Sequence, residues 1–296
     1  MGGTGGVSVA GGTMTDTRAL QADIASAGES AAPDQGLRNR FGPALYGVVS
    51  VAVLLVVWEV LPRIMTLKAG TKLFFTTPGQ IVGTLWNLFA SGAIWTPLGV
   101  SASGFALGLG LAIVVGLPLG VLIGRSRVLN AMLDPFITAF NATPRLVFLP
   151  LVMLWFGLGL WTKVVIVFIG ALFPLLINTY EGVRNADKTL INVVRSFGAS
   201  EWDVARLVVV PNAMPYIIAG LRLAIGRAVL GVVVAEFFGS ESGLGVMMVQ
   251  AAGRYQVDVV FSGLIVFAVL SLALTAMVQV LENRLSRWRP QRAGGE

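Results

Sequence analysis

Ionisable residues inside long apolar segments are the side chains of this sequence most able to do chemistry. Glu59 and Glu236 are the acidic ones, and Arg145, Arg222 and Arg227 are the basic ones. Ionised groups are costly inside a bilayer, so those found there mark ion pairs, proton relays or paths for charged solutes. We take Arg145, Arg227 and Glu236 as candidates for a solute path. Glu59 and Arg222 are expected to reach toward a membrane surface.

Enzymatic chemistry has little to work with in this chain. The sequence contains no Cys and no His, which removes thiol nucleophiles, imidazole acid/base catalysis and the usual zinc sites. No GxxxxGK[ST] stretch is present, so the chain has no phosphate-binding loop of the P-loop type. We therefore expect that the chain is not an enzyme by itself and binds no metal or cofactor.

Composition places these residues in a membrane. Of the 296 residues 55% are hydrophobic and 12% are charged, whereas soluble domains average about 25% charged residues. Leu73 to Gly124, Val164 to Tyr180 and Val259 to Leu281 contain no charged side chain. About 20 apolar helical residues cross a bilayer, so the sequence predicts an all-α membrane protein with about six transmembrane helices.

The predicted transmembrane domain, residues 43–283, is expected to lie between two cytoplasmic tails. Residues 1–42 are expected to be disordered and residues 284–296 to form a basic tail. Residues 62–95 are read as an amphipathic segment at the interface. Three prolines should bend or break the third span. The expected spans are 43–61, 97–124, 133–156, 163–180, 213–238 and 258–281.

The distribution of basic residues sets the orientation. With six spans and the N-terminus inside, thirteen Lys and Arg fall on the inner side and five on the outer side, Lys163 and Arg254 among the five. Cytoplasmic loops carry an excess of these residues, so both termini are expected in the cytoplasm. The same rule accounts for the net charge of +6, and we expect no nucleic-acid partner.

The loop between the fourth and fifth spans, residues 181–212, has a structure of its own. Asp187 can cap a first helix with Val193, Val194 and Phe197 on one face. Gly198 stands where a helix end favours a left-handed residue. Ser200 and Asp203 then resemble a capping box that opens a second helix, which should stop at Pro211. Two short helices with a Gly corner indicate a docking element, although an ordinary amphipathic linker would also fit.

This loop resembles the EAA loop of permease subunits of ATP-binding-cassette importers. The family pattern is Glu-Ala-Ala, three residues, Gly, nine residues, Ile, one residue and Leu-Pro. Gly198, Val208 and the pair Val210-Pro211 stand at that spacing, whereas residues 192–194 are Asn-Val-Val. FGLG at 156–159, FP with NT at 173–179, and AE with GLG at 235–245 resemble the nitrate, sulfonate, taurine and bicarbonate class. The resemblance covers roughly residues 50 to 290.

The resemblance implies a type I importer permease fold in a bacterial inner membrane, with cytoplasmic coupling helices between spans four and five. It also implies a second permease copy, two copies of an ATPase that bind ATP and Mg²⁺, and an extracytoplasmic substrate-binding protein. Small anions are the expected substrates, so a structural ion pair with Arg254 or a neighbouring subunit suits Glu236 better than a substrate contact. The residues expected to couple to the ATPase are Asn192, Val193, Val194, Arg195, Phe197, Gly198, Ala199, Ser200, Trp202 and Pro211.

Two other classes compete with an importer permease. A secondary transporter driven by an ion gradient would be expected to show inverted repeats and coupling acids at the midplane, and we find neither. A membrane-embedded scaffold would need no corner of two capped helices. Related permeases also carry pyrimidine-type vitamin precursors, so the substrate is left open among several small solutes.

Overall fold

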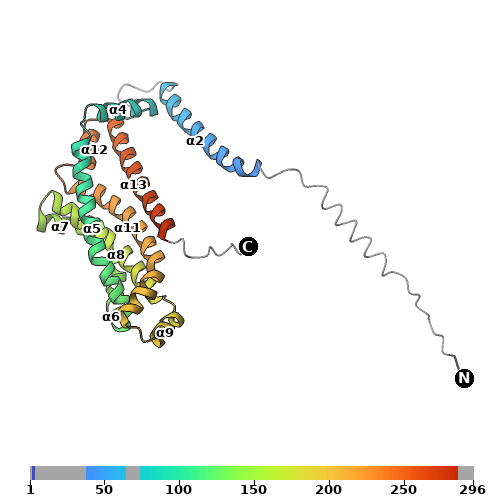
Figure 1. Ribbon diagram of the computed structural model, residues 1–296. Coiled ribbons are helices and arrows are strands. Elements are labelled where there is room, and N and C mark those ends of the chain that lie inside the picture. Colours follow the sequence, from blue (N-terminus) through green and yellow to red (C-terminus); the bar gives the residue numbers. More distant parts are fainter. Residues whose placement is uncertain (1, 4–37, 65–73, 286–296) are drawn as a thin grey trace. The chain divides into compact units, whose positions relative to one another are not determined.

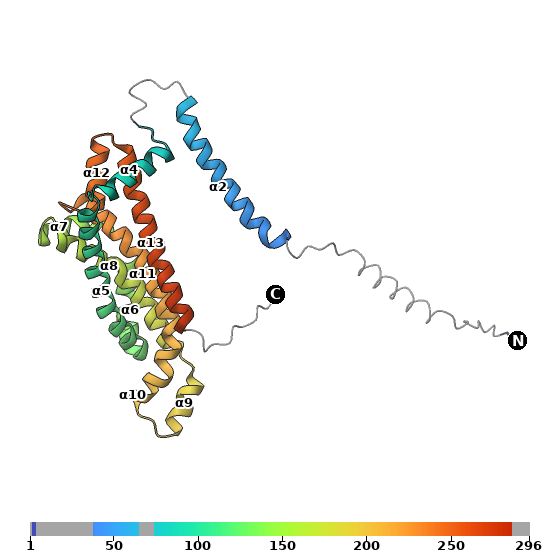
Figure 2. The same ribbon diagram turned by 45° about the horizontal axis from the view of Figure 1, so that its top comes forward.

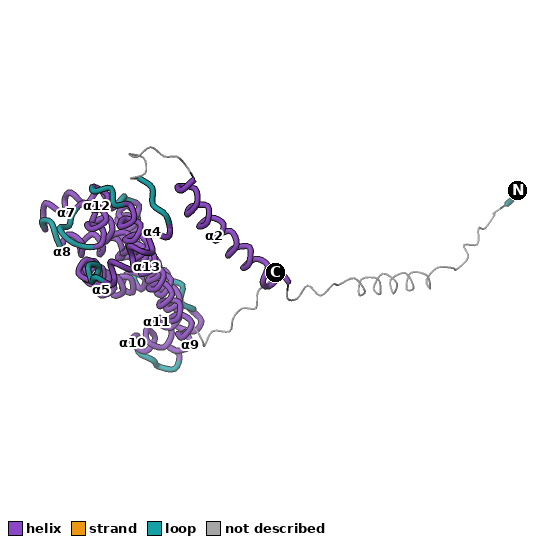
Figure 3. Tube along the Cα trace, turned by 90° about the horizontal axis from the view of Figure 1, so that it is seen from above, coloured by secondary structure: helices purple, strands orange, loops and turns teal. Residues whose placement is uncertain are grey.

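The computed structural model describes residues 2–3, 38–64 and 74–285 of the chain. Over these residues every regular element is a helix, and Figure 3 shows helices and connecting segments only. The chain divides into two compact units, one ending at Leu61 and one beginning at Pro62, and each is described by itself. Most of the two expected tails, 1–42 and 284–296, lies outside the described residues.

The first unit holds most of helix α2 (Arg38–Ile64), which begins five residues before the span expected at residue 43. Its segment Leu45–Ile64 has a mean hydropathy of 2.1, and its side chains are almost all exposed. An apolar helix of 20 residues that buries nothing within its own unit requires lipid or protein around it.

The second unit is a bundle of long helices with short helices at its two ends (Figure 1). Its elements are α4 (Pro78–Ala90), α5 (Trp95–Arg125), α6 (Arg127–Ala142), η1 (Arg145–Phe148), α7 (Leu149–Phe156), α8 (Leu160–Arg184), α9 (Lys188–Ser196), α10 (Glu201–Val204), η2 (Ala205–Val209), α11 (Val210–Phe238), α12 (Leu244–Gly253) and α13 (Val257–Leu285). In Figures 1 and 2, α4 and α12 lie at one end of the bundle and α9 and α10 at the other.

Among the described residues, five helices are long and apolar enough to cross a bilayer, and the bent pair α6–α7 makes a sixth when counted as one span. The predicted class, an all-α membrane protein with about six transmembrane helices, is therefore confirmed. Helices α5, α8, α11 and α13 cover the predicted spans 97–124, 163–180, 213–238 and 258–281 and extend a few residues beyond them.

Helix α8 is the centre of the bundle, and small residues on α5 let it approach closely. Gly104, Gly108, Ala112, Gly116, Gly120 and Gly124 recur every four residues and therefore form one stripe along α5. A Cβ at Gly108 would lie 2.6 Å from the Cβ of Val167, and one at Gly120 would lie 2.6 Å from the Cβ of Thr179. The predicted GxxxG pair is thus part of a longer contact between α5 and α8.

The third span is broken and not merely bent, because the axis of α6 and that of the helical segment after it make an angle of 88°. Thr143 and Pro144 both have extended backbone, with ψ of 130° and 122°. Proline disfavours the helical conformation at the residue before it, which favours the end of α6 at this point, although the helix continues through Pro135. The span predicted at 133–156 is therefore a pair of helices with a break at residues 143–144.

Two predicted loops are in part helical. The loop expected at Gly239 to Val257 contains α12, and the interface segment 62–95 contains α4, which the Thr77–Gln80 capping box opens. The Thr84 hydroxyl donates a 2.6 Å hydrogen bond to Asp258 of α13. Figure 1 shows α4 lying across the end of α13, an orientation that suits a helix at the membrane surface.

The second cytoplasmic helix does not stop at Pro211, contrary to the prediction. Helices α10, η2 and α11 form one continuous rod from Glu201 to Phe238. The π-helical turn η2 precedes Pro211 and is wider than an α-helical turn. A proline ring would otherwise clash with the carbonyl four residues earlier, so the wider turn lets the helix continue through it.

Candidate functional site

The corner between α9 and α10 has the caps that the sequence predicts. Asp187 Oδ1 accepts hydrogen bonds from the backbone N–H groups of Thr189 and Leu190. Gly198 has φ of +79°, in the left-handed region, and no atom lies within 4 Å of the position of a Cβ there. Ser200 and Asp203 exchange their two side chain–backbone hydrogen bonds in a capping box. The corner is therefore a defined turn and not a simple linker.

Ion pairs hold this corner to the rest of the bundle. Arg195 donates to both carboxylate oxygens of Glu201, at 2.9 and 3.1 Å, and Arg125 at the end of α5 donates at 3.2 Å. The hydrogen bond from Arg195, more than the charge of Arg125, holds the pKa of the Glu201 carboxyl below its ordinary value. The rod from Glu201 to Phe238 is about 57 Å long, so these first residues project beyond a hydrocarbon core of about 30 Å.

Large apolar side chains on this projecting corner are left uncovered by the described part of the chain. Phe197 is 87% exposed and Trp202 is 73% exposed, and Val193 is also exposed. Val194 instead packs inward beside Val204 and its neighbours, so the three residues predicted to share one face are divided between two. Phe197 is therefore not packed on the described part of its own chain.

The other predicted coupling residues surround these apolar side chains. Asn192, Arg195, Gly198 and Ser200 are exposed, and Ala199 is half-buried. Pro211 lies two turns further along the rod, half-buried in the first turn of α11. All but Pro211 and the inward-facing Val194 therefore belong to one surface at the end of the bundle.

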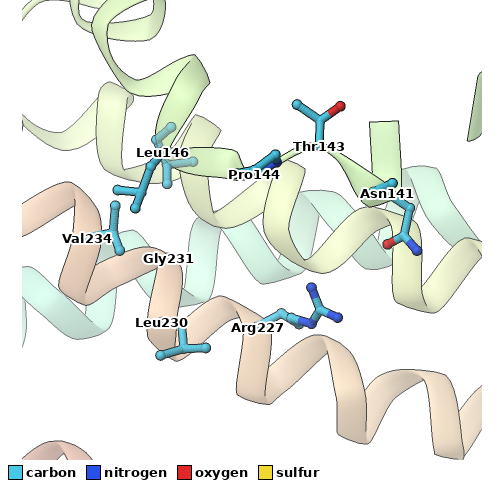
Figure 4. Close-up of a pocket in the computed structure, with 10 residues that line it drawn as sticks. Asn141, Thr143, Pro144, Leu146, Arg227, Leu230, Gly231 and Val234 are labelled. Carbon is cyan, nitrogen blue, oxygen red and sulfur yellow. The ribbon is translucent and has the colours of Figure 1, made fainter. Parts of the chain in front are cut away.

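Among the path candidates, Arg227 is exposed on α11 and lines a cavity of about 260 Å³. Figure 4 shows its guanidinium across the cavity from Asn141, in the last turn of α6, and from the extended residues Thr143 and Pro144 that follow it. Leu230 and Val234 continue the wall along α11, and apolar residues near the break close the other side. The cavity thus combines one cationic group, two uncharged polar side chains and an apolar wall.

Arg145 and Arg222 occupy different places. The backbone of Arg145 begins η1 directly after Pro144, and its side chain lies outside the described residues. Arg222, which was not a path candidate, forms an ion pair with Glu282 near the end of α13. Of the two basic path candidates, Arg227 is the one whose described side chain lines a cavity.

Glu236 does not line this cavity, because its side chain is fully buried. Its Oε1 lies 2.5 Å from the Nζ of Lys163, which is fully buried too, and accepts a 2.7 Å hydrogen bond from the Ser101 hydroxyl. Glu236 is thus in a structural ion pair, as preferred over a substrate contact, but its partner is Lys163 and not Arg254. Lys163 lies buried in the first turn of α8 and not in a loop. The placement of Glu236 on the solute path is not supported in this conformation.

Glycines make room for this ion pair. A Cβ at Gly104 would lie 2.2 Å from Lys163 Cδ, and one at Gly243, where φ is +136°, would lie 2.1 Å from Glu236 Oε1. Gly245 donates its backbone N–H to Glu236 Oε2 at 2.7 Å. The AE and GLG stretches therefore belong to one site: the Glu supplies the carboxylate and the glycines surround it. The sequence analysis did not identify Ser101 and Lys163 as site residues. A lysine between FGLG and the apolar stretch that begins at Val164 could have indicated a buried ion pair.

Comparison with known proteins gives the arrangement a context. The family model of a binding-protein-dependent transport system inner membrane component matches residues 116–287. A putative aliphatic sulfonates transport permease of Bacillus subtilis is 36% identical over 252 residues, which are 85% of this chain and 90% of that protein. The taurine transport system permease of Escherichia coli is 32% identical over 245 residues, 81% of this chain and 88% of that protein.

Solved structures give the same fold. A chain of the inward-facing MetNI methionine ABC transporter superposes with a TM-score of 0.55 at 20% sequence identity, over 65% of this chain and 97% of that chain. At this identity the likeness concerns the fold alone, and it agrees with the predicted type I importer architecture.

Proposed function

The chain belongs to the family of binding-protein-dependent transport system inner membrane components, and on that premise we propose that its Arg227 cavity is part of a translocation path for a small organic anion. The chain is the membrane-spanning permease subunit of an ATP-binding-cassette importer and not an enzyme or a secondary transporter. Importers of this kind work with an ATPase and an external binding protein.

The observation that carries the proposal is the position of Arg227. It lies eleven residues before Phe238, about 16 Å along α11, which is close to half the thickness of a hydrocarbon core. A guanidinium exposed to lipid at that depth costs about 3 kcal/mol. Because Arg227 is exposed in the single chain, the side of α11 that carries it must face water and protein in the working assembly.

The cavity chemistry favours an oxyanion on a short alkyl chain. Arg227 offers a planar set of N–H donors that matches an oxyanion, and Asn141 adds an amide, whereas the Thr143 hydroxyl donates to the carbonyl of Ala139 in α6. Leu146, Leu230 and the rest of the apolar wall suit an alkyl chain and are of little use to bare nitrate or bicarbonate. The relatives named for aliphatic sulfonates and taurine carry such molecules, so we propose a sulfonate as the substrate.

The exposed stripe on α11 also suits a second copy of the chain. Leu223, Arg227 and Leu230 follow one another at helical spacing on a face that the described part of this chain leaves open. A homodimer around this face would enclose the arginines in a shared aqueous path. Each copy would then present one corner, so we propose two ATPase copies, with ATP and Mg²⁺ bound to them.

The corner at the far end of the bundle is the proposed ATPase contact. Phe197 and Trp202 are the exposed apolar anchors, with Asn192, Val193, Arg195 and Ser200 around them. Aromatic side chains that become buried on binding contribute much of the affinity of protein interfaces. Phe197, which is 87% exposed on the free chain, could become buried in this way against the ATPase. From the excess of Lys and Arg on one side of the six expected spans, we propose that both termini lie in the cytoplasm of a bacterial cell.

Uptake of labelled taurine into proteoliposomes tests the path. The complex of this chain with its ATPase is reconstituted, and taurine is delivered by the external binding protein. We expect Arg227→Met to lower the uptake rate by about tenfold to a hundredfold, the effect of losing 1.4 to 3 kcal/mol of charge-assisted hydrogen bonding. Basal ATP hydrolysis should be unchanged, because the corner is untouched.

Leu223→Met is the matched control, since Leu223 lies one turn away on the same exposed stripe and outside the cavity. It should transport taurine normally. Full uptake by Arg227→Met would remove Arg227 from the path. Uptake by the wild-type chain without ATP would contradict an ATP-driven path altogether.

A further inference from the structure

The buried ion pair joins three long helices to the segment that precedes α12. Ser101 lies on α5, Lys163 on α8 and Glu236 near the end of α11. The Ser101 hydroxyl and Lys163 Nζ both donate to Glu236 Oε1, at 2.7 and 2.5 Å. Lys163 Nζ also donates to the carbonyl of Ser242 at 3.2 Å. The Ser101 hydroxyl oxygen accepts the backbone N–H of Leu244 at 2.9 Å. We use the name clip for the side chains of Ser101, Lys163 and Glu236.

Every polar side-chain atom of the clip has a hydrogen-bond partner. Both oxygens of Glu236 are used, one by Lys163 and Ser101 and the other by the backbone N–H of Gly245. A buried charge without its partner is strongly destabilising, and close packing of glycine around the clip excludes water from it. Residues 242–245 therefore cannot move away from the end of α11 without leaving a charge or an N–H group unpaired.

The other end of α11 is the ATPase corner. Helix α11 continues without interruption through η2 into α10, which the ion pairs of Glu201 hold to α9. A displacement of Glu236 is consequently carried along a single rod to the corner. Figures 1 and 2 show α12 and α9 at opposite ends of the bundle.

From this geometry we propose that Ser101, Lys163 and Glu236 are positioning residues that transmit docking of the external binding protein, at the α12 end, to the ATPase at the α9–α10 corner. The proposal rests on the proposed function. Docking displaces residues 242–245, the clip makes α11 follow, and the rod moves the corner. Coupling between two sites needs a rigid element whose position both ends influence, and the clipped rod is one.

The test compares ATP hydrolysis with and without the binding protein. The complex of this chain with its ATPase is placed in lipid nanodiscs, and the binding protein is added loaded with taurine. Ser101→Ala removes the donor to Glu236 and the acceptor for Leu244 while leaving the ion pair. We expect basal hydrolysis to be unchanged and stimulation by the loaded binding protein to fall by about fivefold or more, the lower range of allosteric coupling.

Ser103→Ala is the matched control, because the Ser103 hydroxyl is exposed and donates only to the carbonyl of Val100 in its own helix. It should keep full stimulation. The paired variant Lys163→Met with Glu236→Gln removes both charges together and so leaves no unpaired ion. We expect it to assemble with the ATPase and to lose stimulation as Ser101→Ala does.

Normal stimulation in both variants overturns the proposal, and so does failure of both to assemble with the ATPase, because the clip would then be structural only. If only one variant assembles, its stimulation decides. A wild-type complex that the loaded binding protein does not stimulate contradicts the proposed function instead. The ratio of stimulated to basal hydrolysis is the diagnostic quantity, since loss of stability alone lowers both rates together.

Discussion

The two ends of the helix bundle each contain ion pairs at helix termini, and they differ in everything around those pairs. At the α12 end, Lys163 and Glu236 are fully buried and glycines pack against them. At the α9–α10 end, Arg195 and Glu201 are at least half exposed, beside Phe197 and Trp202 that nothing in the described chain covers. The ion pair at the α12 end is enclosed by its own helices, whereas the one at the corner lies beside exposed apolar side chains.

The difference teaches what each pair can contribute. Loss of one member of a buried pair leaves the other charge buried and uncompensated, which strongly destabilises the fold. The pair therefore holds the segments that carry its two members together. An exposed pair contributes about 0–1 kcal/mol and serves to orient a short helix. The comparison therefore predicts large effects of substitution on stability at the α12 end and effects on partner binding at the corner.

Removing one member of the buried pair should have the largest effect. Lys163→Met leaves the Glu236 carboxylate buried without a cation, and we expect a loss of about 3–5 kcal/mol in the free energy of unfolding. Equilibrium unfolding in mixed detergent micelles measures it. The matched control adds Glu236→Gln to the same chain and should recover most of the loss. A single variant as stable as the wild type would show that the α12 end is held by packing alone.

A change of backbone conformation at the corner should come second. Gly198→Val forces a β-branched residue to φ of +79°, a strain of about 1–3 kcal/mol with no clash to add to it. We expect reduced co-purification of the ATPase and reduced taurine uptake, with a loss of thermal stability in the isolated chain no larger than this strain explains. Gly198→Asn is the control, since Asn tolerates the left-handed region. The coupling assignment fails if the valine variant still retains its ATPase and transports.

The exposed pair should give the smallest effect. Glu201→Gln removes the charged acceptor of Arg195 and Arg125, and we expect the smallest loss in the free energy of unfolding of the three changes, because water screens this exposed pair. Because these groups are exposed, the difference from the wild type should vanish at high salt. Unfolding at low and at 1 M salt measures it. A loss as large as that of Lys163→Met would erase the contrast between the two ends.

Much of the fold follows from the sequence because a bilayer requires long apolar helices, and these can be recognised from the sequence alone. Apolar length alone locates helices such as α5, α8 and α13, and local capping chemistry locates the corner at Asp187, Gly198 and Ser200. These signals need only neighbours within a few residues along the chain. For the same reason they were read correctly without knowledge of any tertiary contact.

The errors are of a different kind. Pro211 was expected to end a helix, but a π-helical turn accommodates it. The segment after Gly239 reads as a loop, yet α12 forms there because Glu236 and Ser101 bind the backbone N–H groups at its start. These outcomes depend on atoms supplied by other helices, which no local pattern contains.

The sequence by itself determined that this chain spans a membrane, how many helices do so, where the capped corner lies and to which family the chain belongs. Only the tertiary structure decided which ionisable residues face a cavity and which are paired. Arg227 and Glu236 look alike in the sequence, as single charges within one apolar helix. They are nine residues apart, and at about 100° per residue their side chains therefore point to opposite sides of α11. Packing against α8 and α5 buries Glu236, whereas Arg227 is left facing a cavity.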